Sequence, residues 1–139
     1  MAEMSIAERD AFLQHARIGM LATLDAAGAP LALPIWYEWD GARARMFSAV
    51  SAPKVARLQR DGRVCLTVAE PVGVPEAWVA IEGVATIEEG TGFAVAQRLA
   101  PRYYPAEQAA RTLAAWGRVA QDWATIVIEP RRIRSSAPE

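Results

Sequence analysis

The chain has 139 residues, 53% of them hydrophobic, and a formal net charge of −1. This length predicts one domain with its own core, and the balanced, interspersed charges argue against a nucleic-acid partner. No apolar run approaches the roughly 18 residues of a membrane span and no signal peptide is recognisable, so we expect a cytoplasmic protein without a membrane partner. A single Cys and a single His exclude an internal disulfide and the usual zinc sites.

The pattern of apolar residues and turn signals predicts a mixed chain that is mainly β. In chain order we predict a helix over residues 5–16, strands over 17–24, 30–39 and 43–48, a helix over 53–60, strands over 63–69 and 77–88, helices over 91–100 and 106–116, and a strand over 124–129. The first helix depends on the capping-box spacing of Ser5 and Glu8. Pro101 is expected to end the third helix, and Pro130 the last strand.

Six strands, several joined as hairpins and interrupted by helices, predict a small antiparallel β-barrel. The whole chain, residues 1–139, is expected to form this single domain. The N-terminal helix lies within residues 1–16 and the barrel with its inserted helices within residues 17–132. Residues 133–139 are expected to form a flexible tail.

Lys54 is the only lysine among fifteen basic residues. It follows Ser48, Ser51 and Pro53, where a strand is predicted to end and a helix to begin. Hydroxyl groups, free backbone N–H groups at a helix start and a cation are the groups that bind a phosphate. The segment therefore indicates a phosphate site. A solvent-exposed helix that happens to keep one lysine is the alternative.

The second strand contains the unusual run Leu-Ala-Leu-Pro-Ile-Trp at residues 31–36. Pro34 cannot donate a ladder hydrogen bond, which favours a sheet edge where a flat ligand meets free backbone groups. A bulge that closes the barrel is the alternative. The five Trp residues exceed what the middle of a small barrel holds, so we expect some to line an interface or a ligand rather than only to pack helices on the barrel.

The common nucleotide-binding and hydrolase motifs are absent: there is no Gly-x-Gly-x-x-Gly, no Walker loop and no Gly-x-Ser-x-Gly. The single histidine, His15, is expected near the end of a peripheral helix, which argues against a Ser–His pair. We assign no catalytic residue and no metal ligand. Tyr37 and Tyr104 are the candidates for a proton donor.

Several segments in order resemble the flavin-binding split-barrel proteins related to pyridoxamine 5′-phosphate oxidase, in particular the short members that use FMN or the deazaflavin F420. The matching segments are residues 19–24, 25–30, 34–37 (Pro-Ile-Trp-Tyr), 46–48, 54–64 and 79–83. They cover about residues 10–90 and, more weakly, the last strand. It is their order and spacing, more than any single segment, that carries the resemblance.

This resemblance implies a six-stranded split β-barrel that forms a homodimer, with two cofactor sites between the subunits. By position, Leu33, Pro34, Ile35 and Trp36 would border the ring system, Phe47 and Ser48 would lie along the ribityl–phosphate path, Ser51 and Lys54 would hold the phosphate, and Trp78 would reach the site from the other subunit.

The chain also departs from the family pattern. The Arg and Lys that the true oxidase carries on its second strand correspond here to Leu33 and Glu38, Pro53 replaces a basic residue, and the C-terminal Arg-Leu-x-Pro element is absent. We therefore do not expect vitamin B6 oxidation. Arg57, one helical turn beyond Lys54, is expected to compensate as a second cation.

Three functional interpretations follow. The first is an FMN-dependent oxidoreductase, or alternatively an F420-dependent one, that acts on a small-molecule substrate. The second is a non-catalytic flavin or tetrapyrrole (haem) carrier, which the apolar barrel and abundant Trp would suit equally well. The third is a barrel whose cofactor site has decayed and whose remaining role is partner binding.

Overall fold

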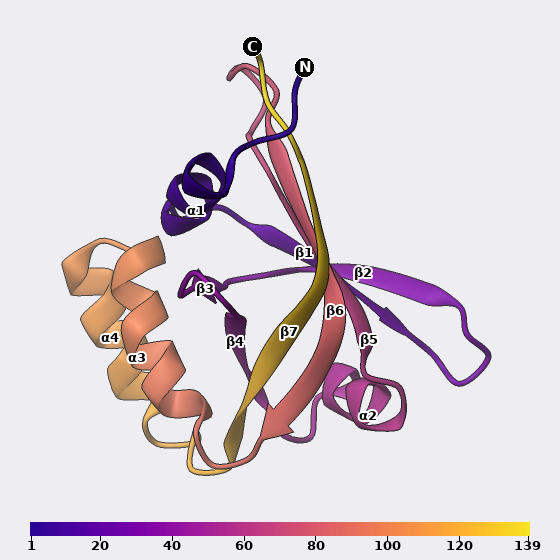
Figure 1. Cartoon of the computed structure of the whole chain (residues 1–139). Helices are drawn as coiled ribbons and strands as arrows, with labels where there is room; N and C mark the ends of the chain where they lie inside the picture. The colour runs from indigo at the N-terminus through magenta and orange to yellow at the C-terminus, as the bar shows by residue number, and fades with distance from the viewer.

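A single curled antiparallel sheet, seen in Figure 1, dominates the computed structural model, which describes all residues 1–139. Its seven strands lie in the order β2-β1-β5-β6-β7-β4-β3. The strands are β1 (Gly19–Leu24), β2 (Pro30–Ile35), β3 (Glu38–Trp39), β4 (Ala44–Ala49), β5 (Arg63–Ala69), β6 (Trp78–Glu88) and β7 (Trp123–Ser136). The antiparallel pairing and the curl confirm the predicted barrel-type fold.

The count of seven strands instead of six arises at one place. The predicted strand over residues 30–39 is interrupted at Trp36 and Tyr37, so it forms β2 and the two-residue β3. Tyr37 is completely buried, and its hydroxyl lies within hydrogen-bond distance of the carbonyls of Leu13 (3.3 Å) and His15 (3.2 Å). These contacts accompany the interruption of the strand. The pattern of apolar residues in the sequence, which is typical of a strand, does not reveal them.

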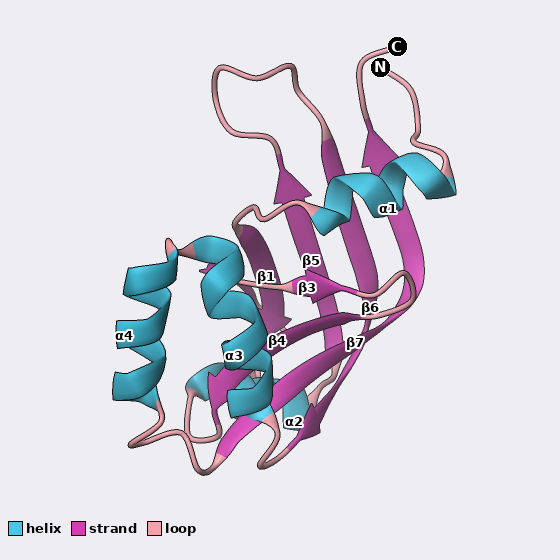
Figure 2. Ribbon diagram, turned by 90° about the vertical axis from the view of Figure 1, so that its left-hand side faces the viewer, coloured by secondary structure: helices cyan, strands magenta, loops and turns pink.

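Four helices accompany the sheet: α1 (Ile6–Gln14), α2 (Pro53–Arg60), α3 (Gly92–Tyr103) and α4 (Ala106–Trp116). Figure 2 shows α3 and α4 side by side, and Figure 1 shows them apart from α2. The capping box that opens α1 is confirmed: Ser5 Oγ accepts a hydrogen bond from the N–H of Glu8, and Glu8 Oε1 accepts one from the N–H of Ser5. None of the helices is long and apolar enough to span a membrane.

The prediction that Pro101 ends the third helix is wrong, because α3 continues to Tyr103. A proline removes one i→i−4 hydrogen bond, and near the end of a helix this loss is offset by other contacts. Here the N–H of Tyr104 donates to the carbonyl of Ala100, and the side chains of Arg102 and Tyr103 bond to backbone of other elements. The last turn of α3 is therefore held by tertiary contacts.

The predicted end of the last strand at Glu129 is also wrong. β7 runs past Pro130 to Ser136, so most of the segment expected to form a tail pairs with β6, and Ala137 bridges to Ala2. A register shift between Glu82 and Gly83, opposite Pro130, accommodates the missing proline N–H. Gly83 is required there, since a Cβ atom would lie 2.2 Å from the carbonyl oxygen of Glu129.

The hydrophobic core fills the concave side of the sheet. Buried side chains alternate along β1, β4 and β5, whereas residues 124–128 of β7 are all buried, because α3 also packs against β7. The core includes Leu21, Met46, Leu66, Val68, Val79, Ile81, Ile126 and Ile128 of the strands and Leu58 of α2. The core fixes the direction in which each strand presents its remaining side chains, and so it positions the site described next.

Candidate functional site

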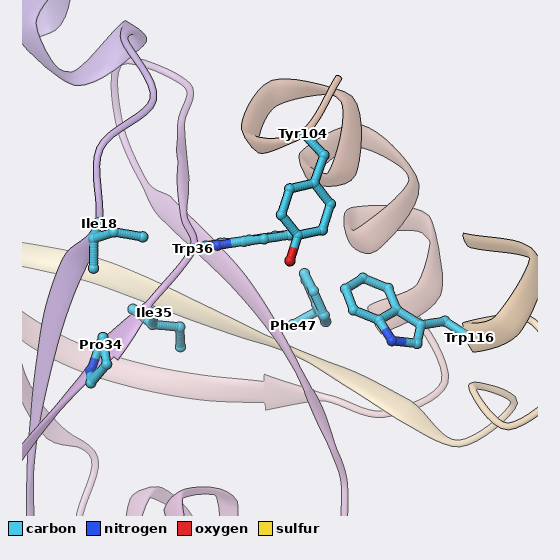
Figure 3. Close-up of a pocket in the computed structure, with 7 residues that line it drawn as sticks. All are labelled: Ile18, Pro34, Ile35, Trp36, Phe47, Tyr104 and Trp116. Atoms are coloured by element: carbon cyan, nitrogen blue, oxygen red, sulfur yellow. The ribbon is translucent and has the colours of Figure 1, made fainter. Parts of the chain in front are cut away.

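Two adjoining cavities open along the edge strand β2. The aromatic chamber, drawn in Figure 3, has a volume of about 400 Å³ and is lined by Ile18, Pro34, Ile35, Trp36, Phe47, Tyr104 and Trp116. The cationic slot is a smaller cavity lined by Leu21, Thr23, Leu33, Pro34, Ile35, Lys54 and Arg57. Pro34 and Ile35 line both cavities, so the two are neighbours along the strand.

The position of Pro34 confirms the expectation of a sheet edge, because β2 is the outermost strand and pairs only with β1. On an edge strand one side of the backbone lacks ladder partners, and a proline is tolerated there. The backbone groups that adjoin Pro34 and Ile35 are therefore available to a ligand that lies along β2.

The interrupted segment between β2 and β3 holds Trp36 in the aromatic chamber. The indole of Trp36 is parallel to the ring of Tyr103, with ring centroids 4.7 Å apart, and perpendicular to the ring of Tyr104 at 4.8 Å. Phe47 on β4 lies 5.4 Å from Trp116 and is stacked on Trp123 at 5.5 Å. Because each ring packs against another ring, the aromatic walls of the chamber stabilise one another.

The cationic slot contains two positive charges without an acidic partner. Lys54 and Arg57 are one turn apart on α2, and neither takes part in an ion pair, whereas seven other arginines do. Arg57 Nε donates to Thr23 Oγ1 at 2.8 Å, which orients the guanidinium. Burial, and secondarily the charge of Arg57, lowers the pKa of Lys54 below its usual value of 10.5. Two adjacent unpaired cations that are half-buried could hold an anion.

The structure brings together seven of the ten residues that the sequence singled out. Leu33, Pro34, Ile35, Lys54 and Arg57 line the slot, and Trp36 and Phe47 join Pro34 and Ile35 in the chamber. Three others lie outside both cavities.

Those three are Ser48, Ser51 and Trp78. Ser48 is 6% exposed and its hydroxyl donates to the carbonyl of Ala49, because alternation along β4 directs it away from the side of Phe47. Ser51 is an exposed residue of the turn before α2. Trp78 is at the start of β6, beside Arg132 and Arg134 of β7.

In the slot, Leu21 and Thr23 were not predicted, and in the chamber three lining residues were not predicted as cofactor-binding residues: Ile18, Tyr104 and Trp116. These three come from the segment before β1, the α3–α4 connection and the end of α4. The number of Trp residues pointed towards Trp116, and Tyr104 was named only as a candidate proton donor. Of the two proton-donor candidates, only Tyr104 lines the chamber, since Tyr37 is buried and bonded to the carbonyls at the end of α1.

Glu38, which stands where the oxidase is expected to carry a lysine, has an ion-pair partner outside the slot. Its carboxylate forms a bidentate ion pair with Arg98 of α3, with Nε at 3.1 and 3.0 Å from its two oxygens. The residue therefore ties β3 to α3 and takes no part in the slot.

Comparisons with known proteins agree with this architecture. A family model described as pyridoxamine 5′-phosphate oxidase matches residues 6–137, and a search of curated proteins found no match. The solved structure of the conserved hypothetical protein Rv2991 from Mycobacterium tuberculosis is 27% identical, with a TM-score of 0.75, over 96% of this chain and 85% of its own.

Two further structures are less similar in sequence and share the fold. An F420 reductase is 22% identical with a TM-score of 0.70, over 89% of this chain and 94% of its own. An FAD-binding protein from Mesorhizobium loti is 20% identical with a TM-score of 0.66, over 96% and 95%. Since the family model covers nearly the whole chain and the curled antiparallel sheet matches these structures, the chain belongs to the pyridoxamine 5′-phosphate oxidase family of split β-barrel proteins.

Proposed function

We propose that this protein is an oxidoreductase that uses FMN, or alternatively F420, and that it works as a homodimer. The observation that carries the proposal is the position of the cationic slot on the free edge strand β2, where Leu33, Pro34 and Ile35 line the slot next to Lys54 and Arg57. A ligand with an anionic end and a flat end matches the two cations and the free edge of β2, and both cofactors have that form. The names of the similar F420 reductase and FAD-binding protein support the same class of ligand.

The slot is only about 10 Å³ in volume, but the charges that line it suit a phosphate bound beside them. Lys54 supplies a point charge and Arg57 a planar fork of donors, which Thr23 already orients. Their mutual repulsion and partial burial make the empty slot unfavourable for both cations, and a bound dianion relieves this cost. Two cations replace the larger basic set of the true oxidase, which supports weaker FMN binding or a preference for F420.

The residues of β2 fit a flat ring system. We infer that the ring lies along Leu33 to Trp36, where the free edge of the strand offers backbone donors and acceptors. The bound cofactor supplies the hydride-transfer chemistry. The chain binds the phosphate of the cofactor, orients the ring of the cofactor and excludes water with the packed aromatic side chains.

A second subunit would complete the site. One face of the sheet carries small or apolar side chains that remain partly exposed, among them Met20, Ala22, Ala32, Thr67 and Ala80, which the strand register places next to one another. Such a flat apolar face is typical of an interface between subunits. We propose that pairing through this face carries Trp78 of one protomer towards the cofactor of the other.

The test is a titration of the purified protein with FMN and with F420, followed by quenching of Trp fluorescence. Lys54→Ala is expected to weaken the binding of the preferred cofactor by about 2 kcal/mol, or roughly thirtyfold in Kd. Arg60→Ala is the matched control, because Arg60 is on the same helix but outside the slot, and it should leave the Kd within about twofold. Binding of neither cofactor would overturn the proposal.

Turnover separates the enzyme from the alternative of a non-catalytic flavin or tetrapyrrole carrier. Reduced cofactor on the protein should be reoxidised faster by an added acceptor than free reduced cofactor is. Tight binding without any such acceleration would favour the carrier. His15, the only histidine, is exposed and does not line the aromatic chamber, so haem in the chamber would lack a histidine ligand from the same chain.

A further inference from the structure

The aromatic chamber is lined without a single ionised side chain. Four of its seven lining residues are aromatic, two are aliphatic and one is proline. Its volume of about 400 Å³ lies in the usual range for small-molecule sites. The family name refers to a substrate with a phosphate and an amine, and nothing in this lining pairs with either charge.

The neighbouring charges are already engaged elsewhere. The guanidinium of Arg102 donates to the carbonyls of Tyr37, Leu13 and His15, and Arg17 pairs with Glu70. Lys54 and Arg57 lie in the slot. An ionised substrate that entered the chamber would therefore lose its hydration without gaining a counter-charge, which is costly.

The chamber is also preformed. Trp36 is fixed by its stack on Tyr103, whose hydroxyl donates to the carbonyl of Arg17 at 2.7 Å and accepts the N–H of Tyr37 at 3.2 Å. Because these side chains are already held in place, a flat ligand that binds between them loses little free energy in ordering them. Figure 3 shows the hydroxyl of Tyr104 directed towards the space between Trp36 and Phe47. It is the only side-chain hydroxyl in the lining.

We propose that the aromatic chamber binds the substrate, and that this substrate is an uncharged planar aromatic compound with a hydrogen-bond acceptor for the hydroxyl of Tyr104. The inference rests on the proposed function, in which the cofactor occupies the cationic slot and the edge of β2. The substrate then stacks among Trp36, Phe47 and Trp116 at the end of the ring system.

The first experiment compares three probes with the same ring: 2-naphthalenemethanol, 2-naphthoate and 2-naphthylmethylammonium. Each is titrated calorimetrically into the cofactor-loaded protein. The neutral probe is expected to bind at least about tenfold more tightly than either ion, because only the ions leave a charge unpaired. Equal affinities for the three probes, or displacement of the cofactor by the neutral probe, would overturn the inference.

Two rim variants sharpen the test. Ile18→Arg places a cation at the half-exposed rim of the chamber, where it should disturb folding little, and should strengthen naphthoate binding by about tenfold or more. Ile6→Arg adds the same charge at an exposed position of α1 outside the chamber and should leave all three affinities unchanged. Equal effects of both variants would indicate a general charge effect and contradict the assignment.

Trp116→Ala removes one wall and should weaken the neutral probe by about tenfold, whereas Trp116→Phe should retain most of the affinity. The probes are titrated into cofactor-free protein as well. If no cofactor binds but the neutral probe still binds and responds to Trp116→Ala, the proposed function fails while the ligand class of the chamber stands. If the cofactor binds but the three probes bind equally, the proposed function stands while the ligand class of the chamber fails.

Discussion

Trp36 and Tyr103 are stacked in parallel, with their ring centroids 4.7 Å apart, although 66 residues separate them in the chain. The same Tyr103 receives the N–H of Tyr37, the residue next to Trp36, on its hydroxyl. One side chain of α3 thus holds both the ring and the backbone of the segment where the strand is interrupted. This arrangement gives the aromatic chamber its shape.

Tyr103→Phe is expected to lower the free energy of unfolding by about 1 to 2 kcal/mol. The variant keeps the stacked ring but removes the hydrogen bonds to Arg17 and from Tyr37. Urea unfolding followed by Trp fluorescence measures the change. Tyr104→Phe is the control, because the hydroxyl of Tyr104 faces the chamber, and it should change stability by less than about 0.5 kcal/mol. Similar losses in both variants would contradict the anchoring role of Tyr103.

Tyr37 predicts a specific loss of stability at alkaline pH. Burial, first among its causes, raises the pKa of Tyr37 from 10.0 to about 12. The folded state thus favours the neutral phenol, and this contribution is complete below pH 10 and is lost as the pH rises from 10 to about 12. The loss amounts to roughly 3 kcal/mol.

The measurement is the difference in unfolding free energy between the protein and Tyr37→Phe, followed across that pH range. Below pH 10 the variant should be less stable, because it lacks the hydroxyl contacts to Leu13 and His15. The difference should shrink as the pH rises. A difference that stays constant would show that the phenol ionises as freely in the folded as in the unfolded chain.

Lys54 predicts the opposite trend. Burial and the neighbouring Arg57 lower the pKa of Lys54 below 10.5, so the unfolded chain binds the proton more strongly than the folded one. The free energy of unfolding of the cofactor-free protein should therefore rise as the pH increases through the lowered pKa towards 10.5. Lys54→Met should lack this rise, and the affinity for inorganic phosphate should fall over the same window. Identical pH profiles of protein and variant would refute the prediction.

Met20→Glu tests the proposed interface. Met20 is 40% exposed on the flat apolar face, so a carboxylate there costs the monomer little but buries a charge in a symmetric dimer. Sedimentation velocity should show dimers for the unchanged protein and monomers for the variant. Ile6→Glu, which adds the same charge on α1, should remain dimeric. A variant that stays dimeric would place the interface elsewhere.

The sequence predicted most elements because their signals are local. The capping box of Ser5 and Glu8 opens α1 as expected, and the apolar pattern and turn signals place four of the strands, β1, β4, β5 and β6, within two residues. The juxtaposition of Lys54 and Arg57 was also predictable, since residues three apart in a helix lie on the same side. Pro34 marked the edge strand through its missing donor.

The predictions that were wrong share a physical cause: contacts between residues far apart in the sequence override a local rule. Pro101 remains in α3 because neighbouring side chains hold the last turn, and Pro130 remains in β7 because Gly83 lets the opposite strand shift its register. Neither partner is visible from the sequence around the proline. The same holds for Trp36 and Tyr37, where burial against α1 and α3 interrupts a strong strand pattern.

By itself, therefore, the sequence determined the antiparallel sheet, the edge strand and the pair of cations on α2, since periodicity, proline chemistry and helical spacing act over a few residues. Only the tertiary structure decided that Ile18, Tyr104 and Trp116 meet Trp36 and Phe47 around one cavity. These side chains come from distant segments, and their meeting depends on how α3 and α4 pack against the curled sheet. No local pattern encodes that packing, because it is set by the fit of complete surfaces.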